Sequence, residues 1–224
     1  MSRKFVCRSC QRLTGHCPIS GGPIEGSQKQ RDNNTTLVQT FKVFRCRECG
    51  ITTFCIDTHV YPGPMMGDSW IETSHYYPAL PSKIKPDWYG NLSKGHKLIL
   101  DEVYKAMDED LLFLTSIGAR TAIDTLIIEL IGDVGSFDEK LKTLVKRGII
   151  DEAERNALDA AIDTGSASAH RGYRPKKGQI NHVMDILESI FFKLKIEPGQ
   201  KKKLAEKVKS LCNATPKRIT SKKD

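Results

Sequence analysis

Four of the seven cysteines form two Cys-x-x-Cys pairs, Cys7 with Cys10 and Cys46 with Cys49, and 35 residues separate the pairs. Each pair forms a tight knuckle that presents two thiolates, and two knuckles complete the tetrahedron that Zn²⁺ prefers. The pattern therefore predicts a structural zinc site held by these four residues. Since four thiolates leave no open position for water or substrate, we expect this site to stabilise a small domain and not to catalyse.

The remaining cysteines, Cys17, Cys55 and Cys212, are interpreted as structural or free thiols. Cys55-x-x-x-His59 has a possible ligand spacing. In a strand, however, residues four apart lie about 13 Å from one another, too far to share one ion. The sequence leaves open whether Cys17, Cys55 or His59 replaces one of the four predicted ligands.

The region that carries the cysteine pairs has the composition of strands and turns. Residues 36–45 and 51–61 concentrate β-branched and aromatic side chains, which predicts two strands paired across the turn at 46–50. The polar stretch 18–34 predicts a surface loop. We expect a zinc-ribbon domain over residues 1–61. A proline-rich connector should follow over 62–91, with a short strand near Trp70 and with its aromatic side chains against the helical part.

Residues after Asn91 have helical periodicity. Apolar residues at steps of three and four predict two long helices. Ser136 and Glu139 form a capping box that starts a third helix, which ends at Gly148. These features predict an all-α domain over residues 92–197.

Three further helices are predicted beyond residue 150. Asp151 is a natural N-cap for a helix that runs to the region of Gly165. A fifth helix is expected over 179–195, and Pro198 should break the chain before a lysine-rich helix from Gln200 to Leu211. Residues 198–224 are interpreted as a basic C-terminal helix and tail. The fold class is therefore α+β, a small β domain followed by a helical bundle.

The net charge of +8 is unevenly distributed along the chain. Residues 1–60 carry +5 and residues 201–224 carry +7, which leaves −4 for residues 61–200. Basic ends suit contact with phosphate backbones or with an acidic partner protein. A like-charged tail is also typical of a solvated terminus. The candidate nucleic-acid-binding residues are Arg171, Arg174, Lys201, Lys202 and Lys203.

The sequence offers no membrane-spanning segment, because no apolar run approaches the roughly 18 residues that a transmembrane helix requires. The first residues also lack the apolar core of a secretory signal. We therefore expect a cytoplasmic protein with no membrane contact. A reducing compartment favours metal binding by cysteines over disulfides.

Several stretches occur in a recognisable order: the knuckle from Cys7 to His16, Tyr77-Pro78, residues 119–124 and residues 165–170. In order and spacing the chain resembles the bacterial proteins that contain the domain of unknown function 4145, up to about residue 195. The resemblance implies a helical domain similar to the HEPN (higher eukaryote and prokaryote nucleotide-binding) superfamily. Members of that superfamily often dimerise and often serve in phage defence. It thus implies a homodimer whose partner is RNA, DNA or a defence-system protein.

Active ribonucleases of that superfamily use an arginine followed, after four to six residues, by a histidine. His170 occupies the histidine position, whereas Asp163 occupies the aligned arginine position and Thr164 follows it. Because an aspartate would repel a phosphate, this departure argues against metal-independent RNA cleavage. A composite catalytic site could instead use His170, Arg171, Arg120 and Asp124. The alternative is a structural network in which Arg120 pairs with Asp124 and His170 caps a helix.

Two functions from different classes follow from these patterns. The first is a non-catalytic protein that binds nucleic acid or a partner protein in prokaryotic defence. The second is a metal-independent ribonuclease centred on His170. Cleavage of RNA that depends on His170 would distinguish them.

Overall fold

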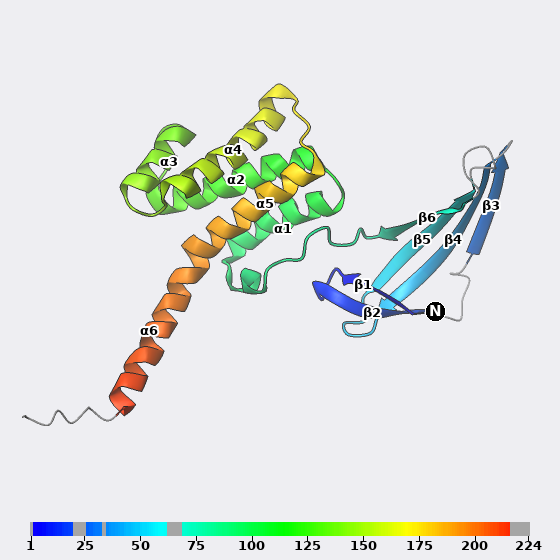
Figure 1. Cartoon of the computed structure of the whole chain (residues 1–224), viewed down its shortest axis with the longest axis horizontal. Coiled ribbons are helices and arrows are strands. Elements are labelled where there is room, and N and C mark those ends of the chain that lie inside the picture. Colours follow the sequence, from blue (N-terminus) through cyan, green and yellow to red (C-terminus); the bar gives the residue numbers. More distant parts are fainter. Residues whose placement is uncertain (1, 20–25, 33–34, 62–68, 216–224) are drawn as a thin grey trace, which may run out of the picture. The chain divides into compact units, whose positions relative to one another are not determined.

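The structure, a computed structural model, describes residues 2–19, 26–32, 35–61 and 69–215 (Figure 1). The chain divides into two units. The strand-bearing unit comprises Met1–Lys85 and Met107–Glu109, and the helical unit comprises Pro86–Ala106 and Asp110–Asp224. This arrangement confirms the α+β fold class.

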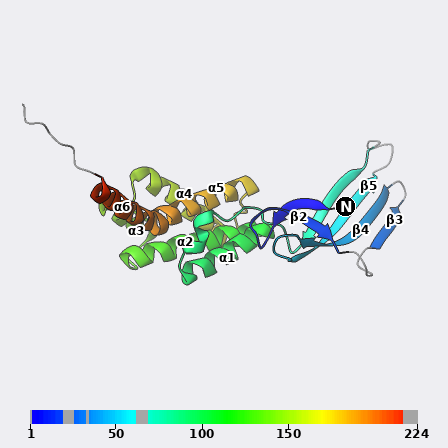
Figure 2. The same ribbon diagram turned by 90° about the horizontal axis from the view of Figure 1, so that it is seen from below.

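The first unit is an antiparallel sheet of six strands, β1 (Arg3–Cys7), β2 (Arg12–Pro18), β3 (Gly26–Asp32), β4 (Thr35–Cys46), β5 (Thr52–Tyr61) and β6 (Ile71–Tyr77). The longest strand, β4, pairs along its length with β5, which confirms the two predicted strands and their turn. Its other edge is shared, because β2 pairs with residues 44–46 and β3 with residues 35–41. Figure 2 shows the same sheet from a second direction.

Two features of the sheet differ from the sequence prediction. The predicted surface loop 18–34 contains β3, whose polar sequence has low strand propensity but whose backbone completes the free edge of β4. The predicted ribbon domain also extends beyond residue 61, because β6 pairs with β5 in full register. The expected short strand near Trp70 is confirmed as β6, and it belongs to the sheet.

The aromatic side chains of the predicted connector are divided between the two units. Tyr76 packs against Phe5, with ring centroids 4.9 Å apart, and Tyr77 packs against Phe54 at 6.2 Å. The expectation that these tyrosines lie against the helices is therefore wrong, because β6 places them on the sheet. For Trp88 and Tyr89 the expectation holds, since Trp88 contacts Phe192 and Tyr89 contacts Tyr104.

The second unit contains helices α1 (Lys94–Asp108), α2 (Leu112–Ile131), α3 (Phe137–Lys146), α4 (Glu152–Arg171), α5 (Lys177–Phe191) and α6 (Glu197–Ala214). Local sequence signals set several of their ends. Capping boxes start α3 at Ser136 and α4 at Asp151, as predicted. Helix α4 runs past Gly165 to Arg171 and ends where Gly172 adopts a left-handed φ of 63°.

Helix α2 is the centre of this unit. Its buried residues include Ala119, Ile123 and Leu126, which are shielded from solvent on a helix that is apolar around much of its circumference. Helix α4 approaches it closely at Gly165, because a Cβ added there would lie 2.6 Å from the Arg120 Cβ. Gly165, near which the sequence predicts the end of α4, therefore lies inside the helix at a position of close packing.

The connection between α5 and α6 corrects a further prediction. Pro198 was expected to break the chain, but the helix continues from α5 through a π-helical turn, Phe192–Ile196, directly into α6. Proline lacks an N–H and clashes with the carbonyl four residues before it in a regular helix. A wider turn before Pro198 accommodates that ring without ending the helix.

Candidate functional site

The four predicted metal ligands lie in two turns of similar geometry. Cys7 ends β1 and Cys10 follows in the turn to β2, while Cys46 ends β4 and Cys49 follows in the turn to β5. In both turns the residue directly after the second cysteine has a positive φ, 52° at Gln11 and 76° at Gly50. The N–H of that residue donates to the carbonyl of the first cysteine, at 2.8 Å and 3.0 Å. The sequence therefore folds into two matching knuckles.

The sulfur atoms of the four cysteines are clustered. All four Sγ atoms lie within 4.8 Å of one another, with Cys7 to Cys49 at 3.6 Å and Cys10 to Cys46 at 3.9 Å. Thiolates bound about 2.3 Å from a zinc ion in a tetrahedron are separated by about 3.8 Å. The cluster is therefore compatible with a metal site closed by four thiolates.

Polar contacts tie the two knuckles together and to the sheet. Arg12 of β2 forms an ion pair with Glu48 of the second knuckle, in which Nε lies 3.1 Å from Oε2. The hydroxyl of Thr14 lies 3.4 Å from the Cys46 Sγ. The Arg47 N–H donates to the Gly15 carbonyl at 2.9 Å. These contacts hold the second knuckle against β2.

The four thiols differ in acidity. Burial works to raise the pKa of Cys46, but backbone N–H groups of its own knuckle and the Thr14 hydroxyl lower it to about 6. The pKa of Cys49 is also lowered, chiefly by a backbone N–H. Burial raises the pKa of Cys7 and raises that of Cys10 to about 12. Because crowded thiolates repel one another, all four ionise together only around a cation.

Other candidate ligands do not join this cluster. Cys17 Sγ lies 3.6 Å from the Arg45 carbonyl, and Cys212 is exposed on α6. His59 pairs with Glu72, with 3.3 Å between Nδ1 and Oε1. Within the described ranges, the grouped cysteines are Cys7, Cys10, Cys46 and Cys49.

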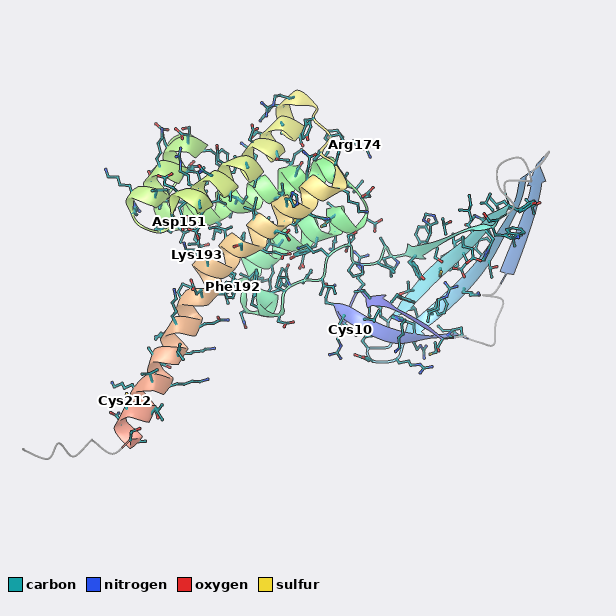
Figure 3. The ribbon with its side chains drawn as sticks, viewed as in Figure 1. Cys10, Asp151, Arg174, Phe192, Lys193 and Cys212 are labelled. Carbon is teal, nitrogen blue, oxygen red and sulfur yellow. The ribbon has the colours of Figure 1, made fainter. Side chains whose placement is uncertain are left out.

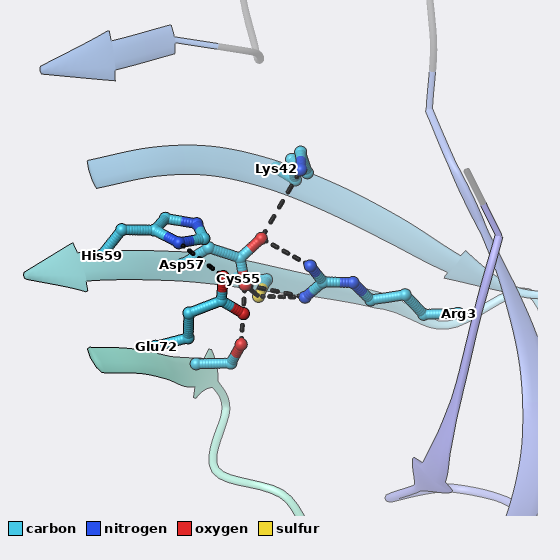
Figure 4. Close-up of polar contacts among 7 residues, drawn as sticks. Arg3, Lys42, Cys55, Asp57, His59 and Glu72 are labelled. Carbon is cyan, nitrogen blue, oxygen red and sulfur yellow. Dashed lines mark hydrogen bonds and ion pairs between the residues drawn. The ribbon is translucent and has the colours of Figure 1, made fainter. Parts of the chain in front are cut away.

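A buried ionic cluster on β5 was not anticipated from the sequence (Figure 4). Asp57 is 4% exposed and accepts two hydrogen bonds of 2.7 Å from the Arg3 guanidinium. Ser74 donates to the same carboxylate at 2.7 Å, and the Lys42 Nζ lies 3.5 Å away. Burial opposes ionisation, but Arg3 and Ser74 hold the pKa of Asp57 well below its usual range. The sequence contains one signal for this cluster. Cys55, Asp57 and His59 occupy alternate positions, which places all three side chains on one face of the sheet.

The predicted catalytic residues lie on α2 and α4, and their charged groups have other partners. Arg171 pairs with Asp163 at 2.8 Å, and the Arg120 guanidinium lies 4.7 Å from the centroid of the Phe137 ring. Asp124 accepts from Lys140 at 2.9 Å, so the predicted Arg120–Asp124 pair is replaced by a contact to α3.

His170 is exposed near the end of α4. An open groove beside this region is lined by Asp163, Thr164, Ala167, Arg171 and Tyr173. A phosphate placed there would meet the aspartate as well as the arginine. The groove therefore lacks the excess positive charge that a phosphate site requires.

The candidate lysines of α6 are fully accessible. Lys201, Lys202 and Lys203 are exposed, and Lys201 pairs with Glu197 of the same helix at 3.0 Å. Two more exposed lysines, Lys207 and Lys209, follow them on α6. Figure 3 shows side chains projecting from this helix on several sides, with Cys212 near its end.

A family model described as "Domain of unknown function (DUF4145)" matches residues 101–213. The chain belongs to this family. The matched DUF4145 residues extend from within α1 to within α6, whereas the cysteine cluster lies before them. No curated protein and no solved structure matches the chain. Among the described residues of this DUF4145 protein, no helix is long and apolar enough to cross a membrane.

Proposed function

We propose that this DUF4145 protein binds nucleic acid through contacts between α6 and phosphate groups, and that it does not cleave the bound strand. A structural zinc ion held by the four cysteines stabilises the sheet unit in this proposal. A HEPN-like fold of the helical unit and a role in prokaryotic defence are parts of the same proposal.

The exposed charge of α6 is the observation that carries the proposal. The helix has five lysines and two glutamates. Lys202, Lys203, Lys207 and Lys209 make no ion pair within the part of the chain that the structure describes. Unpaired cations on a projecting helix replace the counterions condensed on a phosphate backbone, and this exchange drives binding that weakens with salt.

The absence of cleavage is proposed because the nearby arginines are engaged. Arg171 is paired with Asp163 and Arg120 lies over Phe137, so neither guanidinium is directed to a phosphate beside His170. A general acid–base histidine without a cation to stabilise the developing phosphate charge is a poor nuclease centre. The exposed position of His170 keeps the ribonuclease as the second candidate function.

The phosphate contacts are tested by measuring binding to single-stranded RNA and duplex DNA by fluorescence anisotropy across a range of salt concentrations. Each lost phosphate contact should reduce the slope of log K against log salt by about 0.7 on single strands and about 0.9 on duplex DNA. The double variant Lys202→Gln/Lys209→Gln should therefore reduce the slope by about 1.4 on RNA. The matched control is Lys94→Gln/Lys105→Gln, which removes two exposed lysines from α1.

Unchanged binding by the α6 variant, together with weakened binding by the α1 variant, would contradict the assignment to α6. Cleavage is tested with the same RNA in the absence of added metal ions. If the wild-type protein cleaves the strand and His170→Ala does not, the ribonuclease replaces the proposed binding function.

A further inference from the structure

Helix α6 carries an apolar stripe that lies open. Leu204, Val208 and Leu211 are 61%, 51% and 68% exposed, although their spacing of four and three places them on one helix face. The structure buries no residue of α6. The helix continues α5 through the π-helical turn and extends beyond the other helices of its unit (Figure 1). Three large aliphatic side chains in a row are therefore available to a partner.

The lysines of α6 are arranged around this stripe. At about 100° per residue, Lys201 and Lys207 lie about 60° to either side of Leu204, whereas Lys202 and Lys209 lie on the opposite face. A surface that accepts the stripe would therefore meet two flanking lysines. The opposite lysines would stay in solvent.

The same helical unit contains a groove of complementary character. It lies between α4 and α5, where Ala157, Leu158, Ile186 and Ile190 provide an apolar floor and walls. Glu154 and Asp185 also line it. Lys193 of the same chain already pairs with Glu154, and Asp185 also has an interaction within the chain, so the apolar fit supplies the main attraction. Two carboxylates beside one lysine still leave this region with a net negative charge, which is complementary to the two flanking lysines.

One chain does not bring these two surfaces together. The groove runs beside α5, whereas α6 leaves from the end of α5 and continues outward without a break. Docking within one chain would require the helix to fold back at the π-helical turn. A second copy meets the groove with its own α6 and no such change.

We propose that two copies of this chain form a symmetric dimer in which the stripe of Leu204, Val208 and Leu211 from each copy docks in the α4–α5 groove of the other. Each contact is a helix in a groove with anchors at steps of four and three residues. The reciprocal arrangement supplies that contact twice and closes the assembly. The dimer leaves Lys202 and Lys209 exposed, so it is compatible with the proposed binding of nucleic acid but does not depend on it.

Charge and composition favour this occupant over others. In a direct pairing of two α6 helices, lysines that flank one stripe would face lysines that flank the other. A membrane surface is less suitable, because interfacial helices usually place aromatic side chains on their apolar face, and this stripe has none. A second groove, between α1 and α2, includes Leu114 and Val103 but has a single acidic residue, Glu102.

Sedimentation velocity of the full chain, in reducing buffer and without nucleic acid, measures the assembly directly. The reductant is needed because Cys212 is exposed on α6 and could link two copies. The wild-type protein should be a dimer. Leu204→Glu/Val208→Glu, which charges the stripe, and Ala157→Arg, which fills the groove, should each give monomers. Leu114→Glu, an equally exposed change in the α1–α2 groove, should stay dimeric.

Mixing the two monomeric variants distinguishes the proposal from pairing of two α6 helices. The stripe variant retains an intact groove and the groove variant retains an intact stripe, so the mixture should form a heterodimer through one remaining contact. Circular dichroism verifies that each variant keeps its helical content and melting temperature.

A monomeric wild-type protein at high micromolar concentration would overturn the proposal, as would a stripe variant that stays dimeric. Failure of the mixture to associate would overturn the groove as the docking site. Each of these results is obtained without nucleic acid and therefore leaves the proposed phosphate contacts to their own test.

Discussion

The Sγ atoms of Cys7 and Cys49 lie 3.6 Å apart, although 42 positions separate the residues in the sequence. This contact joins the first knuckle to the second, and together with the contact between Cys10 and Cys46 it brings four sulfur atoms into one cluster. The sheet core beside it is small, because its buried apolar cluster consists of Phe5, Phe44 and Cys55, with Tyr76 and Leu80 packed against them. We therefore expect a metal ion bound by the four sulfur atoms to contribute much of the stability of this unit.

We predict about one zinc ion per chain, and its loss on replacement of Cys46 by serine. Removal of one thiolate leaves an incomplete tetrahedron, so the sheet unit should unfold while the helices remain. Metal content by atomic absorption and helical content by far-ultraviolet circular dichroism measure the two effects. Cys17→Ser is the matched control, because Cys17 lies outside the cluster and should leave the zinc content unchanged.

The ion pair between Arg3 and Asp57 should make the sheet unit sensitive to acid. Arg3 and Ser74 keep the pKa of Asp57 below the value of 3.8 expected for a free aspartate, so the unfolded state binds the proton more readily. The contribution of this carboxylate is therefore complete above about pH 4 and is lost as the pH falls toward its folded-state pKa. Asp57→Asn should lower the free energy of unfolding by about 3 kcal/mol near neutral pH.

Chemical denaturation followed by tryptophan and tyrosine fluorescence measures that change in unfolding free energy. Glu72→Gln serves as the control on the neighbouring strand. Its carboxylate is largely exposed, and its pair with His59 should contribute less than about 1 kcal/mol. An Asp57→Asn variant as stable as Glu72→Gln would show that the buried pair contributes no net stability.

The parts of the fold that could be predicted depend on local sequence. The knuckles follow from cysteine spacing, and the starts of α3 and α4 follow from capping boxes within four residues. Strand β3 could not be predicted in this way, since the free edge of β4 and not its own composition makes it a strand. The sequence predicts the end of α4 near Gly165, whereas the helix continues to Arg171 and Gly165 admits the Arg120 side chain from α2.

Spacing along α2 does not determine the partners of the candidate catalytic residues Arg120 and Asp124. Arg120 and Asp124 are four residues apart on α2, which predicts a pair. Helix α3 supplies each of them with a different partner, Phe137 for the arginine and Lys140 for the aspartate. The choice between these partners depends on how α3 packs, and helical periodicity does not contain that information.

Burial of His96 should make the helical unit less stable in mild acid. The imidazole is 5% exposed, and burial lowers its pKa although Glu129 lies 2.8 Å from its Nε2 and acts in the opposite direction. The unfolded chain then binds a proton more readily, so stability is complete above the free value of 6.5 and falls as the pH drops through that value toward the folded-state pKa.

The wild-type melting temperature should therefore decrease between pH 7 and pH 5, and part of that decrease should be absent in His96→Gln. Differential scanning calorimetry across this range measures the dependence. His182→Gln removes an exposed histidine of α5 and should keep the wild-type dependence. Equal slopes for wild type and His96→Gln would assign the pH dependence to other groups.

The close approach of α2 and α4 at Gly165 should make this position intolerant of any side chain. An alanine Cβ would lie 2.6 Å from the Arg120 Cβ and 2.7 Å from the Ser116 carbonyl oxygen. Because both atoms are fixed to the backbone of α2, they can move away only if the two helices separate. Separation would also stretch the 2.8 Å hydrogen bond between the hydroxyls of Ser116 and Ser168. Gly165→Ala should therefore lower the free energy of unfolding by about 1–3 kcal/mol, as overpacking does in cores, although alanine has the higher helix propensity.

Gly178→Ala in α5 is the matched control, because nothing lies within 4 Å of the Cβ it would add. Thermal denaturation followed by circular dichroism should show a lower midpoint for Gly165→Ala and an unchanged or higher one for Gly178→Ala, and a Gly165→Ala protein as stable as this control would contradict the close packing of the two helices.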